Sequence, residues 1–86
     1  MPDKIDESAL DQLFRDARTF SHWTGEPVGE DQLRAIWDLA CMGPTAANSS
    51  PARIVFVVSD AAKEKLKPCL APGNVDQTMS AAATAI

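Results

Sequence analysis

Four apolar residues near the start of the chain recur at helical spacing: Leu10, Leu13, Phe14 and Ala17. On a helix they would share one face, as in an amphipathic surface helix. The pattern predicts a first helix over residues 9–17 or 9–18, with the Ser8 side chain as its N-cap. The stretch from Thr19 to Pro27, which includes Trp23, is expected to be a loop.

A second apolar stripe has the same spacing: Leu33, Ile36, Trp37 and Ala40. We expect this stripe to be buried in a helix that begins after Gly29, because Glu30 and Asp31 suit the positive end of a helix dipole. Gly43 is expected to supply the C-cap, and Pro44 prevents the helix from continuing.

The second half of the chain alternates between strand and helix patterns. Residues 54–58, IVFVV, are continuously apolar and mostly β-branched, which predicts a strand buried on both faces. Asp60 is expected to cap a third helix over residues 61–67, which Pro68 bends or ends. Turn residues at 71–74 precede an expected helix over residues 75–82, and residues 83–86 indicate a second strand. Two strands alone do not make a stable sheet.

Length and charge narrow the classes of protein to consider. Eighty-six residues allow at most one domain, near the lower limit for a self-sufficient core. The 12 acidic and 8 basic residues are scattered and sum to −4, which argues against a nucleic-acid or anionic membrane partner. No segment has the roughly 18 apolar residues of a membrane span. Met1-Pro-Asp-Lys leads into acidic residues and not into a signal peptide, so we expect a cytoplasmic protein.

Few side chains carry obvious reactive chemistry. Cys41 and Cys69 lack the spacing of a metal knuckle or a redox pair, and we expect both thiols to be buried or half-buried. His22 has no neighbouring metal-ligand pattern, so no metal site is expected. His22 could polarise a substrate carbonyl, or it could be a half-exposed loop histidine. The sequence has no catalytic triad and no Gly-rich dinucleotide loop, and the catalytic residue therefore stays unknown.

Residues 44–51, PTAANSSP, form a loop with little side-chain bulk between a helix and a strand. Its backbone could approach a flat ligand closely, and its hydroxyl and amide groups could hydrogen-bond that ligand. The alternative is an ordinary connector, because Pro, Asn and Ser are common turn residues for local reasons.

Three separated motifs, ARTFSHW, GPTAANSSPAR and KEKLKPCLAPGN, occur in this order. Together they resemble the nitroreductase-like FMN flavoproteins, and in particular their malonic semialdehyde reductase branch of bacterial pyrimidine degradation. The resemblance implies that residues 1–86 are the N-terminal portion of a larger α+β sandwich. Further sequence and a second subunit would complete its sheet, and the flavin would lie at the interface of a homodimer.

The resemblance also implies a set of FMN-binding residues: Arg18, Thr19, Ser21, His22, Pro44, Thr45, Ala46, Asn48 and Asn74. The first four lie in the motif on the flavin phosphate side, where a guanidinium suits phosphate oxygens. The loop residues would contact the isoalloxazine ring, largely from the partner subunit, and Asn74 would contact the ring edge. For Arg18 the alternative is a cation that closes a helix end, and for Asn74 it is a simple turn residue.

The implied activity is an FMN-dependent oxidoreductase that uses NADH or NADPH and reduces malonic semialdehyde to 3-hydroxypropionate. Nitroaromatics, quinones and enones suit the same open flavin face. The competing hypothesis is a non-catalytic fragment or a small helical interaction domain, and the 86-residue chain by itself is expected to be inactive.

Overall fold

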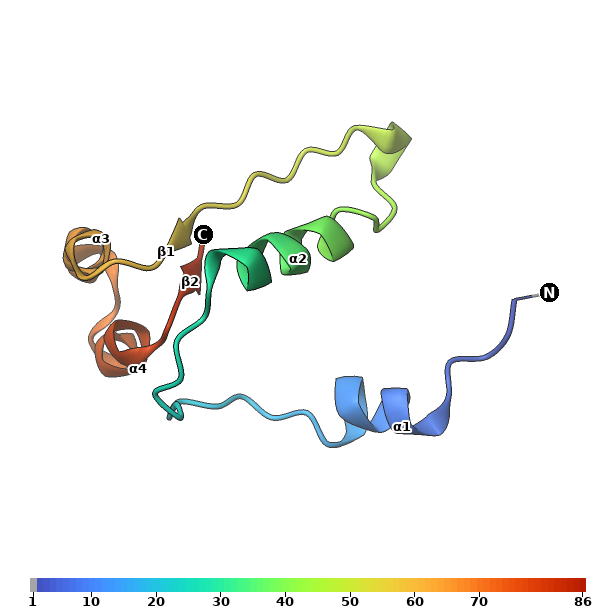
Figure 1. The fold of residues 1–86 in the computed structure, drawn as a ribbon, viewed down its shortest axis with the longest axis horizontal. Coiled ribbons are helices and arrows are strands. Elements are labelled where there is room, and N and C mark those ends of the chain that lie inside the picture. Colours follow the sequence, from blue (N-terminus) through green and yellow to red (C-terminus); the bar gives the residue numbers. More distant parts are fainter. Residues whose placement is uncertain (1) are drawn as a thin grey trace.

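The computed structural model describes residues 2–86. The helices and strands are α1 (Glu7–Leu10), α2 (Glu30–Ala40), β1 (Phe56–Val57), α3 (Asp60–Leu66), α4 (Val75–Ser80) and β2 (Thr84–Ala85). This order confirms the predicted succession and a mixed α and β composition. Figure 1 shows α2, α3 and α4 near one small sheet, with α1 apart from them. Met1 belongs to the N-terminal residues from which we expected no signal peptide, and it lies outside the described residues.

The first helix begins two residues earlier than predicted, and Ser8 is not its N-cap. The Asp6 carboxylate accepts from the backbone N–H of Ala9 at 2.8 Å and from the Ser8 hydroxyl at 2.9 Å. These two hydrogen bonds, the backbone one first, lower the pKa of Asp6 below its ordinary 3.8. The helix continues from α1 into a π-helical turn at Asp11–Arg15 and ends there, short of the predicted residue 17 or 18.

α2 starts at Glu30 with Gly29 as its N-cap, as predicted, but it ends at Ala40 with Cys41 as its C-cap. The prediction that Gly43 caps this helix is wrong, because the last residues form tight turns before Gly43 is reached. Of the predicted buried stripe, Leu33 is buried and Trp37 is half-buried, whereas Ile36 and Ala40 are exposed. Nothing in the described part of the chain packs across the rest of the stripe.

β1 pairs antiparallel with β2, with Phe56 opposite Ala85 and Val57 opposite Thr84. Val55 and Ile86 exchange two backbone hydrogen bonds of 2.9 Å. This pair extends the ladder by one residue in each strand, at one end of the sheet. The predicted strand over residues 54–58 is therefore too long, and its burial on both faces is wrong for this chain. Val57 is buried, but most of its neighbours are exposed because the sheet has only two strands, each of which has one open edge.

Ser59, and not Asp60, caps α3, because its hydroxyl accepts from the N–H of Ala62 at 3.1 Å. A 3-10 turn at Lys67–Cys69 ends this helix at the proline, as predicted. α4 follows a 3-10 turn at Pro72–Asn74 and stops at Ser80, two residues before the predicted end. Both thiols, those of Cys41 and Cys69, are exposed, which corrects the expectation that they are buried.

The core within residues 2–86 consists of Leu33, Val57 and Ala81. The radius of gyration is 16.0 Å, against about 12 Å for a compact domain of this length. α1 stands apart from the other elements, and the segment between α2 and β1 swings away from the sheet (Figure 1). The described chain therefore leaves most of its apolar side chains uncovered.

Candidate functional site

Two hydrogen bonds to one residue, Thr45, hold the small-residue loop after α2. The Thr45 carbonyl accepts from the N–H of Asn48, and its hydroxyl accepts from the N–H of Ser50, both at 3.0 Å. The backbone of this loop is left-handed at three residues: Ala47, Asn48 and Ser50 have φ of 52°, 53° and 46°. Non-glycine residues rarely adopt this conformation, at a cost of about 1–2 kcal/mol each, so the loop is held in an uncommon shape.

The predicted ring-contacting residues all lie in this loop. Pro44, Ala46 and Asn48 are exposed, and Thr45 is half-buried. Ala46–Asn48 form a 3-10 turn. The exposure of these small residues leaves a backbone-rich surface that a flat molecule can approach.

The Arg18 guanidinium lies at the end of the first helical segment. Its Nη1 donates to the carbonyl of Ala17 at 2.7 Å and to that of Arg15 at 3.1 Å. This is the helix-closing geometry that the sequence left open as the alternative. Within the described residues Arg18 forms no ion pair, so its charge is not neutralised by a neighbouring carboxylate.

Thr19 and Ser21 are exposed beside it, and the Ser21 hydroxyl lies 3.2 Å from Nδ1 of His22. His22 is exposed and borders an open hollow of about 810 Å³ that also includes Lys63 and Ser80. The next residue, Trp23, fixes this segment, because its indole N–H donates to the Gln77 carbonyl in α4 at 2.7 Å.

Asn74 occupies the turn before α4. Its side-chain oxygen accepts from the Gln77 amide at 3.1 Å, and its backbone N–H donates to the Ala71 carbonyl at 2.9 Å. It makes no side-chain capping bond to the helix backbone. These are local turn contacts, and the amide remains exposed at the surface.

Within one chain the three groups of predicted site residues do not meet. The loop after α2 lies apart from the other two groups (Figure 1). Within residues 2–86, the segment from Arg18 to His22 is connected to the region of Asn74 only through the Trp23–Gln77 hydrogen bond. The hollow that contains His22 includes no other predicted site residue, and the hollow that contains Thr45 includes none of the other eight.

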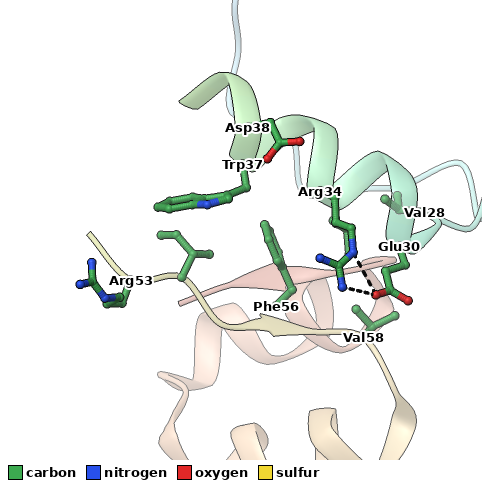
Figure 2. A pocket seen from close by; sticks show the side chains of 10 residues that line it. Val28, Glu30, Arg34, Trp37, Asp38, Arg53, Phe56 and Val58 are labelled. Atoms are coloured by element: carbon green, nitrogen blue, oxygen red, sulfur yellow. Dashed lines mark hydrogen bonds and ion pairs between the residues drawn. The ribbon is translucent and has the colours of Figure 1, made fainter. Parts of the chain in front are cut away.

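The structure adds a groove that the sequence analysis did not single out. Figure 2 shows Trp37 of α2 and Phe56 of β1 extending from opposite sides into a space of about 740 Å³. Arg34 and Glu30 form an ion pair at 2.7 Å along its border. The alternation of Ile54, Phe56 and Val58 on one side of the strand was the sequence signal, because all three line this groove.

Two further properties concern metals and membranes. Among residues 2–86, no three His, Cys, Asp or Glu side chains gather in a way that could hold a metal ion. Within the same range, no helix has both the length and the apolar character that crossing a bilayer requires.

The chain is similar to several curated bacterial proteins. It is 50% identical over 82 residues to a Ralstonia nicotianae protein named "Putative NADH dehydrogenase/NAD(P)H nitroreductase", covering 95% of this chain and 42% of that protein. Proteins with the same description from Stenotrophomonas maltophilia and Polynucleobacter asymbioticus are 52% and 50% identical over 86 residues. These two alignments cover all of this chain and 44% of each relative.

The chain thus spans less than half the length of the curated relatives that it matches. No family model matches it. The similarity is continuous and includes all three motifs, because the two longer alignments run over the whole chain.

Proposed function

We propose that the protein carrying this chain is an FMN-dependent NAD(P)H oxidoreductase of the nitroreductase-like family. The observation that carries the proposal is about 50% identity, over 82–86 residues, to three proteins named "Putative NADH dehydrogenase/NAD(P)H nitroreductase". Such identity along a continuous alignment supports a shared fold and a shared nicotinamide donor. The cofactor and the substrate are finer steps of the proposal, argued from the residues.

The donor set of this chain fits FMN. Arg18 carries a charge that no carboxylate neutralises within the described residues, which suits a phosphate group. Thr19 and Ser21 are exposed hydroxyls beside it. The loop at Pro44–Asn48 presents small side chains and backbone, which a flat ring requires for close approach.

FMN, when bound, supplies the chemistry of accepting a hydride from a nicotinamide and delivering it to a substrate. The residues of this chain would hold and orient the group. Arg18 would bind the phosphate, and the loop around Thr45 would border the ring without crowding its open face. Asn74 would contact the ring edge. None of these residues needs to move a proton, and we assign none of them as a catalytic acid or base.

We propose a homodimer, and the separation of these groups supports it. The Arg18 segment and the small-residue loop lie apart within one chain (Figure 1). If the loop contacts a flavin held by the partner subunit, the two groups meet across the interface and not within one protomer. We therefore place the flavin site between subunits, in a cytoplasmic enzyme with a small-molecule substrate.

The substrate that we propose is malonic semialdehyde, reduced to 3-hydroxypropionate. The support is the resemblance of the NSSPAR segment, residues 48–53, to that branch. Nitroaromatics, quinones and enones are the broader enzymatic alternative, because an open flavin face accepts them as well.

The test is to purify the intact protein, record its flavin absorbance, and measure NADH and NADPH oxidation with each acceptor class. Bound FMN and aldehyde-dependent turnover are the expected results. Turnover with a nitroaromatic or a quinone but not with the aldehyde would refute the substrate and retain the flavoenzyme. An intact protein that neither retains nor binds added FMN would refute the proposal itself.

The competing proposal is a non-catalytic helical interaction domain. It is favoured by one observation, the small core of Leu33, Val57 and Ala81 beside many exposed apolar side chains. Flavin titration separates the two hypotheses, because an interaction domain has no reason to bind FMN.

A further inference from the structure

The loop that carries Trp23 is anchored by one long-range hydrogen bond. Residues 17–29 form no helix or strand, and among the described residues no backbone–backbone hydrogen bond involves residues 19–28. The Trp23 indole N–H donates to the Gln77 carbonyl at 2.7 Å, across 54 positions of sequence. The other side-chain hydrogen bonds of residues 2–86 join residues no more than five positions apart. Trp23 is therefore the hydrogen-bonded anchor of this loop on α4 (Figure 1).

The bond forms because α4 ends with a free carbonyl. The last four carbonyl groups of a helix have no intrahelical partner, and Gln77 is the fourth residue from the end of α4 at Ser80. The N–H of Ala81, which would pair with Gln77 in a longer helix, donates to Thr78 instead. The Gln77 carbonyl accepts from Trp23, and the Ser80 hydroxyl lies 3.4 Å from it.

Trp23 lies between two of the predicted FMN-binding groups. On one side, Gln77 also donates its side-chain Nε2 to the Asn74 oxygen at 3.1 Å, so the residue that accepts from Trp23 also contacts Asn74. On the other side, Arg18 precedes Trp23 by five residues. Their Cα atoms therefore lie at most about 18 Å apart. That limit is on the scale of one extended FMN molecule.

We propose that Trp23 is a positioning residue for FMN. Its hydrogen bond keeps the phosphate-side segment, residues 18–21, at a fixed separation from the ring-edge residue Asn74. The inference rests on the proposed function and adds a residue outside its FMN-binding set. Trp23 is assigned no contact with the flavin, and it acts through Arg18.

FMN is sensitive to such a link because its phosphate and its ring lie at opposite ends of a ribityl chain. Without the Trp23 bond, Arg18 and Asn74 keep their own local contacts, since these involve only neighbouring residues. The two ends of the site then move relative to each other, and FMN binding must include the cost of ordering them. Riboflavin has the same ring and chain but no phosphate, so its binding does not include this cost.

Flavin titration of the intact protein tests the role, with Trp23→Phe as the variant. Phenylalanine keeps an aromatic side chain and removes the N–H donor. We expect FMN to bind about tenfold more weakly, the scale of one lost hydrogen bond to a charged group, and riboflavin affinity to change by less than about twofold. Ser59→Ala is the matched control, because it removes a hydrogen bond at the start of α3. It should leave the ratio of the FMN and riboflavin affinities unchanged.

A double-mutant cycle shows whether Trp23 acts through Arg18. In an Arg18→Ala background the phosphate has lost its guanidinium partner, so adding Trp23→Phe should change FMN affinity by no more than about twofold. Independent effects would instead multiply, and the double variant would bind FMN about tenfold more weakly than Arg18→Ala alone. That second result would refute the positioning role.

Hydrogen exchange of the unsubstituted protein decides the matter if Trp23→Phe does not fold. Coupling between sites is reciprocal, so a ligand whose binding depends on the Trp23 bond also stabilises that bond. Exchange of the Trp23 indole N–H, followed by NMR with the Trp37 indole N–H as reference, should slow more with saturating FMN than with saturating riboflavin. Equal slowing by the two flavins would overturn the proposal.

Failure of this inference and failure of the proposed function give different results. An intact protein that binds no FMN refutes the proposed function, and the role of Trp23 is refuted with it. A protein that binds FMN, but in which Trp23→Phe weakens FMN and riboflavin equally or weakens neither, refutes the positioning role alone.

Discussion

Two valines on one face of the same strand differ sharply in exposure, and this difference gives a test of how the strand is covered. Val57 is 7% exposed and Val55 is 62% exposed. Truncating a valine to alanine removes two methyl groups, worth about 0.8 kcal/mol each when fully buried. Val57→Ala should therefore cost about 1.6 kcal/mol, and Val55→Ala about 0.6 kcal/mol if its exposure stays as it is in this chain.

In the intact protein we expect Val55→Ala to cost as much as Val57→Ala, about 1.6 kcal/mol. The reason is that the IVFVV pattern predicts a strand covered along its whole length, which residues 2–86 do not provide by themselves. Both substitutions change strand propensity in the same way, so the comparison isolates burial.

The measurement is urea unfolding followed by circular dichroism, with each variant's free energy of unfolding compared with that of the parent. A cost of 0.6 kcal/mol or less for Val55→Ala, with Val57→Ala near 1.6 kcal/mol, would refute the reasoning. It would mean that this face of the strand stays open to solvent at Val55 in the complete molecule.

Three other changes have expected outcomes. Arg18→Ala should weaken FMN binding by roughly 1.5–3 kcal/mol in a flavin titration, and unchanged affinity at equal stability would leave Arg18 as a helix-end cation. Trp23→Phe keeps an aromatic side chain but removes the indole N–H and its hydrogen bond to the Gln77 carbonyl, so urea unfolding should show a loss of at least about 0.5–1.5 kcal/mol. Asp6 has a folded pKa below 3.8, so its capping contribution is present above that pH and is lost as the pH falls through the lower folded value. Exchange protection of the Ala9 amide should follow this loss, and Asp6→Asn should abolish the dependence.

The order of elements could be predicted from the sequence because it depends on local patterns. Helical spacing, the Gly29 start and the helix-ending Pro68 are all signals carried by neighbouring residues. The two N-cap errors have one cause: where two side-chain acceptors compete, the sequence alone does not show which of them reaches the free N–H groups. Asp6 replaced Ser8 at one helix start, and Ser59 replaced Asp60 at another.

The burial of side chains was predicted poorly. Burial depends on which other segments pack against a residue, and the hydrophobic pattern of the sequence does not show this. The stripe of α2 and the residues beside Val57 have the composition of a core, yet the described chain has nothing to place over most of them. The candidate FMN residues remain a prediction for the same reason, since one chain does not bring Arg18, Thr45 and Asn74 together. The groove at Trp37 and Phe56 could not be predicted from local patterns, because it forms only where α2 crosses over the strand.

The left-handed backbone of the small-residue loop has a consequence for binding thermodynamics. Glycines at Ala47 and Ser50 would let the backbone sample both signs of φ, whereas alanine and serine there restrict the alternatives. The Thr45 bonds then select one conformation before any ligand arrives. An exposed loop of this kind should show NMR order parameters near those of rigid backbone, about 0.85, on the ps–ns timescale. A flat ligand would then bind with little loss of backbone entropy, because the loop is already ordered before binding.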